Sequence, residues 1–105
     1  MTDTETLAEL LGRLARDVAA EHSSKDGAAA GYSREGRPFA FFEGEVVELR
    51  LHPDVAAAAV RTNDTTSSDK GSGWVRVAPS TVDRFVLDRV EAWFLSAWRA
   101  ASDDA

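Results

Sequence analysis

The sequence predicts a small α+β domain, in which an antiparallel sheet of about four strands packs against three helices. Two observations predict this class. Apolar residues recur at helical spacing near both ends of the chain. The segments between them either alternate apolar with polar residues or are continuously apolar, as is typical of strands. The strands also follow one another through short turns, which favours antiparallel hairpins covered by helices on one face. The predicted order is helix, three strands, helix, strand, helix (α-β-β-β-α-β-α).

The composition supports a single domain over residues 1–105, because 44% hydrophobic and 29% charged residues are globular values. The absence of cysteine excludes a disulfide scaffold, thiol catalysis and Cys-based zinc sites. The acidic N-terminus is not of the signal-peptide type, and no apolar run approaches the ~18 residues of a membrane span. We therefore expect a cytoplasmic protein with no membrane contact.

The first predicted helix covers residues 5–22 and ends near Gly27. Its apolar stripe consists of Leu7, Leu10, Leu11, Leu14 and Val18. Either Thr2 with Glu5 or Thr6 with Glu9 has the spacing of a capping box. The helix is therefore expected to pack one leucine-rich face against the sheet.

Three strands are predicted next, at residues 28–33, 38–42 and 45–52, with a bend at Gly36 and a tight connection at 43–44. The third strand alternates cleanly, since Val47, Leu49 and Leu51 fall on one face and Glu48 and Arg50 on the other. This alternation is typical of a half-buried strand paired in a hairpin.

Pro53 favours a short Ala-rich helix over residues 53–62, since its missing N–H costs nothing in the first turn. A polar, glycine-containing loop at 63–73 follows and is predicted to be mobile, and a fourth strand covers 74–78. A long helix capped by Ser80 is expected to bury an aromatic stripe that includes Trp93, and the tail 102–105 is expected to fray.

The stretch GRPFAFFEGEVVELRLHPDVAAAAV, a polar loop, GSGWVRV and a closing helix resemble the small bacterial "luciferase-like" domains. The layout is also similar to that of the MmcQ/YjbR group. The resemblance covers residues 31–98 and implies an α+β fold with a small curved sheet. It implies no catalytic residues, and for the MmcQ/YjbR group it implies DNA binding through a double-wing arrangement. The chain departs from the luciferase-like pattern, because phenylalanines and acidic residues stand where those domains often carry histidines.

The sequence carries no pattern of a metal site or of nucleophilic catalysis. His22 and His52 do not form an i, i+4 ligand pair, and no G-x-S-x-G motif or phosphate-binding loop is present. We therefore predict no metal and no cofactor. His52 is interpreted as the residue that ends a strand and caps the following helix, with a general-base role as the alternative.

The aromatic residues of the hairpin are the most informative for binding. Phe41 and Phe42 are adjacent, so in a strand they face opposite sides, and one of them or Tyr32 is expected to point away from the helices. An exposed aromatic on an open sheet indicates a ligand cleft or a partner, for which a second copy of the chain is favoured. The predicted contact residues are Tyr32, Arg37, Phe41, Arg50, His52 and Trp74.

The charge balance disfavours nucleic acid as a partner. The net charge is −6, from 12 basic and 18 acidic side chains. Arg34 and Arg37 would meet Lys70 at one edge if the hairpin turn lay near the 63–73 loop, which would provide only a few phosphate contacts. The first hypothesis is therefore a non-enzymatic binding or interaction domain of unassigned ligand. The alternatives are a DNA-binding module, and a small-molecule binder or enzyme that uses a cleft between the hairpin and the 63–73 loop.

Overall fold

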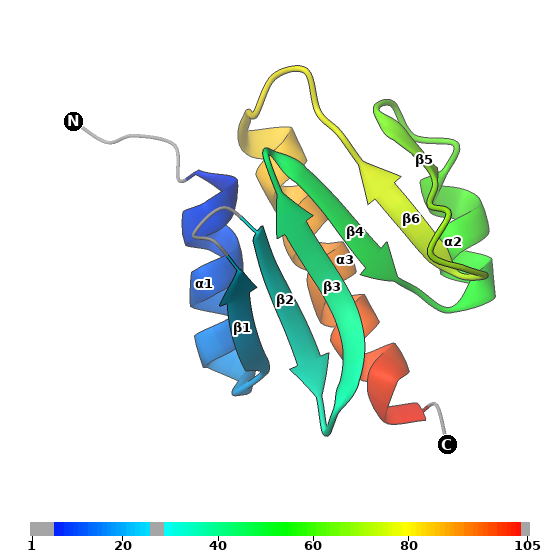
Figure 1. Cartoon of the computed structure of the whole chain (residues 1–105). Coiled ribbons are helices and arrows are strands. Elements are labelled where there is room, and N and C mark those ends of the chain that lie inside the picture. The colour runs from blue at the N-terminus through cyan, green and yellow to red at the C-terminus, as the bar shows by residue number, and fades with distance from the viewer. Residues whose placement is uncertain (1–5, 26–28, 104–105) are drawn as a thin grey trace.

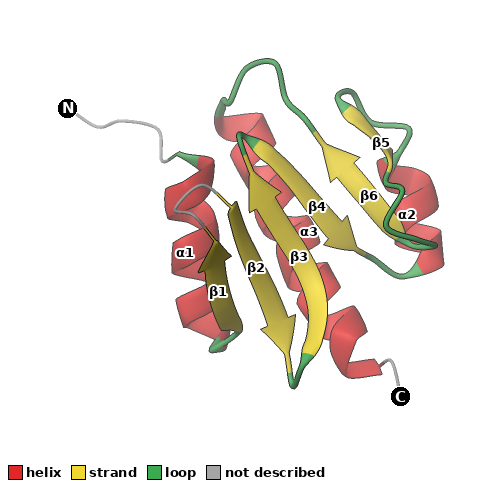
Figure 2. Cartoon of the chain, in the orientation of Figure 1, coloured by secondary structure: helices red, strands yellow, loops and turns green. Residues whose placement is uncertain are grey.

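The computed structural model describes residues 6–25 and 29–103 and confirms the α+β class. The elements are α1 (Leu7–Val18), β1 (Glu21–Lys25), β2 (Ala29–Arg34), β3 (Arg37–Glu43), β4 (Val46–Arg50), α2 (Pro53–Ala59), β5 (Thr65–Ser67), β6 (Trp74–Val77) and α3 (Arg84–Asp103). All strands are antiparallel in one sheet of order β1-β2-β3-β4-β6-β5. Helices α1 and α3 lie on one face of this sheet, and α2 lies beside β5 and β6 (Figures 1 and 2).

The sheet has six strands, so the prediction of about four strands is corrected. The N-terminal helix ends at Val18 because Ala19 adopts the left-handed conformation (φ 58°) and its N–H bonds back to Ala15 and Arg16. The chain is then free to extend as β1, which pairs with β2. The predicted helix end at Gly27 lies outside the described residues.

Strands β1 and β5 are the two that the sequence did not predict. β5 lies within the segment predicted as the 63–73 loop. Its short run from Thr65 to Ser67 pairs with β6. Two of its three residues are exposed and all three are polar, so it carries no apolar alternation that a sequence pattern could detect. The mobility of residues 63–73 stays a prediction.

Caps set the starts of the two long helices. Thr6 and Glu9 form the capping box, with Thr6 N donating to Glu9 Oε1 at 2.9 Å and Glu9 N donating to Thr6 Oγ1 at 3.1 Å. The prediction that Ser80 caps the last helix is wrong. Asp83 Oδ1 accepts from Val86 N at 3.0 Å, so α3 begins at Arg84. It continues to Asp103, which places the first residues of the predicted frayed tail in a helix.

The core lies between the sheet and helices α1 and α3. The leucine stripe of α1 is buried there together with Val47 and Leu49 of β4, as the alternation predicts. On α3 the centre of the aromatic stripe is the fully buried Phe94, whereas Trp93 is only partly buried at its margin. The two helices therefore leave the opposite face of the sheet open.

A β-bulge in β3 decides which aromatic residues reach that open face. Tyr32 pairs with Ala40 and Ser33 with Pro38, so Phe39 is an extra residue in β3. Phe39 and Ala40 are consequently both buried although they are adjacent. Beyond the bulge the normal alternation resumes.

Candidate functional site

One row of paired residues crosses the sheet on its open face. The register joins Ser23, Gly31, Phe41, Glu48, Arg76 and Thr66 in that order, one from each strand. Residues directly opposite each other in antiparallel strands project to the same side. Because Phe42 and Val47, in the neighbouring positions, belong to the core side, this row faces away from α1 and α3.

The centre of the open face is an aromatic pair. The Phe41 and Trp74 rings stack with centroids 5.6 Å apart and an interplanar angle of 30°. They come from β3 and β6, which are separated by β4, so the two rings meet across that strand. Gly31 completes the arrangement, since a Cβ at this position would lie only 3.2 Å from the Phe41 ring. The absence of a side chain on Gly31 thus gives the ring room to lie over β2.

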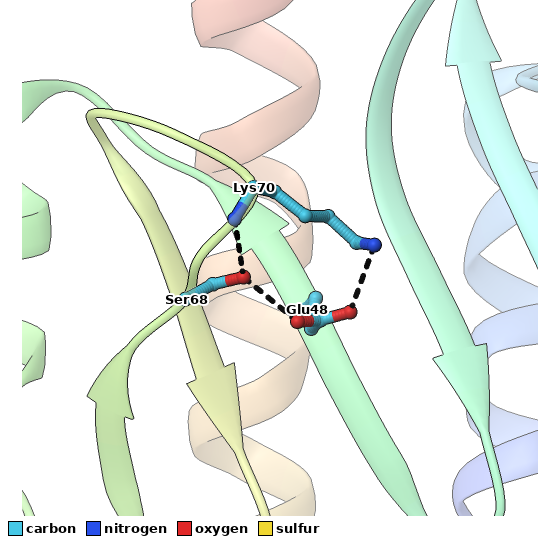
Figure 3. Close-up of polar contacts among 3 residues, drawn as sticks. All are labelled: Glu48, Ser68 and Lys70. Atoms are coloured by element: carbon cyan, nitrogen blue, oxygen red, sulfur yellow. Dashed lines mark hydrogen bonds and ion pairs between the residues drawn. The ribbon is translucent and has the colours of Figure 1, made fainter.

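A polar cluster next to the aromatic pair consists of Glu48, Ser68 and Lys70. Figure 3 shows the contacts among these three residues. Ser68 Oγ donates to Glu48 Oε2 at 2.7 Å, and Lys70 Nζ lies 3.3 Å from Glu48 Oε1. Ser68 Oγ also accepts from the Lys70 amide at 3.2 Å. The Lys70 ammonium lies 4.8 Å from the Phe41 ring centroid, and it is therefore held between an aromatic ring and a carboxylate.

A hollow of about 420 Å³ opens on this face, between the hairpin strands and Lys70 of the 63–73 segment. Phe41, Gly31 and Val46 give it an apolar part. Its charged lining consists of Glu43, Glu48, Lys70 and Arg76. A mixed surface of this kind can hold a small molecule by apolar contact and orient it by charge.

Three of the six predicted contact residues share the open face: Phe41, Trp74 and Arg50. Arg50 is the cross-strand partner of Trp74. Arg50 also borders a second hollow of about 340 Å³, together with His52 and Gly73. His52 occupies the N-cap position of α2, as expected, and its carbonyl accepts from Ala56 N at 2.8 Å, whereas its side chain makes no capping hydrogen bond.

Tyr32 does not lie on the open face. Its side chain is 3% exposed and packs edge-on against Phe94, with centroids 5.5 Å apart, while His22 stacks on its other side at 5.0 Å. Burial raises the pKa of the Tyr32 phenol above its ordinary value of 10.0. Tyr32 is a core residue because the bulge pairs it with the inward-facing Ala40.

Arg37 and Arg34 lie at the β2–β3 turn and bind α3. Arg34 Nη1 donates to the Trp98 carbonyl at 3.0 Å, and its guanidinium lies 3.5 Å from the centroid of the Trp98 ring. Arg37 Nη1 donates to the Ala101 carbonyl at 2.9 Å. The condition under which these arginines would meet Lys70 at one edge is not met, because they bind α3 whereas Lys70 lies on the open face.

The alternation of β4 already assigned Glu48 to the polar side of its strand. No local pattern indicated that Ser68 and Lys70 would converge on it, because 20 or more residues separate them in sequence. Arg76 likewise carries no local signal of a site, and only the sheet register places it beside Glu48.

Two features are absent from residues 6–25 and 29–103. No group of three His, Asp or Glu side chains in these ranges has the geometry to hold a metal ion. Across the same ranges, no helix combines the length and apolar character needed to cross a membrane.

Comparison of the chain with protein-family models, curated proteins and solved structures finds no match. The resemblance to the luciferase-like and MmcQ/YjbR groups therefore stays a prediction.

Proposed function

We propose that this chain is a binding domain that takes a small ligand in the hollow on the open face of its sheet. The observation that carries the proposal is the stacked pair of Phe41 and Trp74 on the face that α1 and α3 leave uncovered. Phe41 lines the hollow, and Trp74 supports its ring by stacking from outside the lining. An aromatic side chain lining a concave surface favours binding, since covering it removes apolar area from water. The volume of about 420 Å³ lies within the range typical of ligand pockets.

Binding rather than catalysis is proposed because Glu48 and Lys70, two of the four charged residues that line the hollow, are paired with each other. Glu48 accepts from Ser68 and pairs with Lys70, an arrangement that orients a carboxylate. The sequence also carries none of the nucleophile or phosphate-loop motifs that would assign a reaction. We place the protein in the cytoplasm on the basis of its lack of cysteine.

A thermal-shift screen of small metabolites tests the proposal. A ligand present at about one hundred times its Kd stabilises the fold by about 2.7 kcal/mol, which is a readily measured rise in Tm. A supporting hit is lost in Phe41→Ala and retained in Phe85→Ala, which removes an aromatic side chain that is 76% exposed on α3. Hits that survive Phe41→Ala, or a screen without hits, would count against the proposal.

A second candidate is a homodimer joined through the same face. Glu43 and Glu48 lie there with Lys70 and Arg76, so the face carries both signs of charge. A two-fold interface pairs a surface with itself, which such a mixture permits. Sedimentation equilibrium of the wild type and of Arg76→Glu tests this candidate. The homodimer candidate requires that the wild type forms a dimer and that Arg76→Glu weakens this dimer. A wild type that stays monomeric at high micromolar concentration excludes the candidate.

DNA binding of the MmcQ/YjbR type is the least supported candidate. Arg34 and Arg37 contact α3, and Lys70 is paired with Glu48, so three of the cations considered for phosphate contact already have protein partners. A gel shift at low salt tests it, where electrostatic binding is strongest. No shift of duplex DNA at micromolar protein removes this candidate.

A further inference from the structure

We propose that the position between the Phe41 ring and the Glu48 carboxylate is a binding site for an organic ammonium group, which Lys70 of the same chain fills in this structure. A ligand that carries a primary alkylammonium would take the place of the Lys70 ammonium. The inference rests on the proposed function and specifies the chemistry of its ligand.

The two groups that contact the Lys70 ammonium are those that favour a cation. The ammonium lies 4.8 Å from the Phe41 centroid, within the ~6 Å at which the negative ring face attracts it. The ammonium also lies 3.3 Å from Glu48 Oε1. A ring face and a carboxylate together select a positively charged group that also carries apolar carbon, because the ring attracts both.

These two groups are held in place independently of Lys70. The Glu48 side chain is 18% exposed and its other oxygen accepts from Ser68 at 2.7 Å. The Phe41 ring is confined by Trp74 on one side and by the close approach to Gly31 on the other. Both groups project from paired strands, so the site is preorganised for a cation whether or not Lys70 occupies it.

Lys70, in contrast, reaches the site from the turn between β5 and β6, and its side chain is 37% exposed. The Lys70 side chain therefore occupies the ammonium site in the way that a tethered ligand would. A tethered group competes with free ligand at an effective concentration of about the millimolar order. The wild-type protein is therefore expected to bind a free amine more weakly than a variant without the Lys70 ammonium.

The adjoining hollow accounts for the rest of the ligand. Gly31, Phe41 and Val46 supply apolar surface for a short carbon chain attached to the ammonium. Arg76, the cross-strand neighbour of Glu48, lies on the same lining and would face a ligand carboxylate if one is present. The position of the ammonium itself is the one that Lys70 occupies.

Titration of Lys70→Ala with n-butylammonium tests the inference, followed by amide shifts of Gly31, Phe41 and Ser68 in NMR spectra. Lys70→Ala is expected to bind this probe about threefold or more tightly than the wild type, since the tethered competitor is gone. Arg99→Ala, which removes an exposed cation from α3, is the matched control and is expected to bind as the wild type does.

Two second-site variants and two probes make the result decisive. In the Lys70→Ala background, Glu48→Gln and Phe41→Leu should each weaken butylammonium binding, and Phe41→Leu serves as the independent check if Glu48→Gln does not fold. Neutral n-butanol and anionic butyrate should shift these amides less than butylammonium does. Equal shifts from n-butanol, preferential binding of butyrate, or affinity unchanged by both variants would overturn the inference.

The ammonium inference and the proposed function fail in different ways. If butyrate or n-butanol binds the hollow and Phe41→Ala removes that binding, the binding function stands and the ammonium inference falls. If none of the three probes shifts the amides, the inference falls as well, and the metabolite screen with Phe41→Ala decides the function on its own.

Discussion

The backbone of Gly73 lies directly against that of Leu51 at the end of β4. The Gly73 carbonyl accepts a hydrogen bond from the Leu51 amide at 2.8 Å, and a Cβ on Gly73 would lie 2.8 Å from the Leu51 carbonyl oxygen. Gly73 also has φ +85°. This contact fixes the start of β6 and thereby positions Trp74 for its stack on Phe41.

Gly73→Ala is therefore expected to destabilise the protein for two reasons, the positive φ and the collision with Leu51. Gly36→Ala is the matched control, since Gly36 has φ +80° but nothing within 4 Å of an added Cβ. The left-handed conformation alone costs about 1–2 kcal/mol for a residue with a side chain. Urea denaturation should show a greater loss for Gly73→Ala than for Gly36→Ala. Equal losses would mean that the contact with Leu51 relaxes without cost.

Phe94→Ala is expected to lower the free energy of unfolding by about 3–5 kcal/mol, because it empties the centre of the core. Phe94 is fully buried and packs edge-on against Phe39, with centroids 5.2 Å apart. Trp93→Ala should cost less, since Trp93 lies at the margin of the core. Denaturant titration of both variants provides the comparison. A cost for Trp93→Ala that matches or exceeds that of Phe94→Ala contradicts the observed stripe.

Arg34→Ala should cost about 1–3 kcal/mol, the range for a hydrogen bond to a charged group together with a guanidinium stacked on indole. Both interactions tie the β2–β3 turn to Trp98 of α3. Arg34→Lys should not restore the loss, since an ammonium lacks the planar fork that stacks and donates at once. Arg99→Ala is the exposed control, with an expected change within about 0.5 kcal/mol. Full rescue by lysine would show that charge alone matters.

Stability is expected to fall at high pH because of Tyr32. Burial raises its pKa above 10.0 in the folded state. The raised pKa contributes stability that is fully present below the unfolded value and is lost as pH rises from about 10 through the folded value. Tyr32 is the single tyrosine, so absorbance at 295 nm reports its phenolate alone. Tyr32→Phe should reduce the loss of stability above pH 10, and an unchanged profile would contradict the assignment to Tyr32.

Ser68→Ala should loosen the turn that carries Lys70. Ser68 Oγ accepts from the Lys70 amide and donates to Glu48, so its removal frees one end of each interaction. Loss of a hydrogen bond worth about 1 kcal/mol increases local opening about fivefold. Hydrogen exchange of the Lys70 amide measures this change. Ser67→Ala, at an exposed position of β5, is the control, and an equal increase there would attribute the effect to β5 rather than to Ser68.

The sequence by itself determined the elements that local patterns encode. The spacing of Thr6 and Glu9 marks the start of α1, the alternation through Val47 and Leu49 marks β4, and Pro53 marks the start of α2. Each signal acts within a few residues, where side chains meet their own backbone or share one face of an element. Such signals can be read before the chain is folded.

Only the tertiary structure decided where the strands without such a pattern form, and which residues lie on the open face. β1 and β5 exist through backbone pairing with neighbours, which polar sequences do not reveal. The bulge at Phe39 turned Tyr32 inward and Phe41 outward, although both are equally compatible with either side of a strand. Lys70 reached Glu48 because a turn and a sheet register placed them together. Contacts between distant residues depend on pairing and register, and neither is encoded in the local sequence.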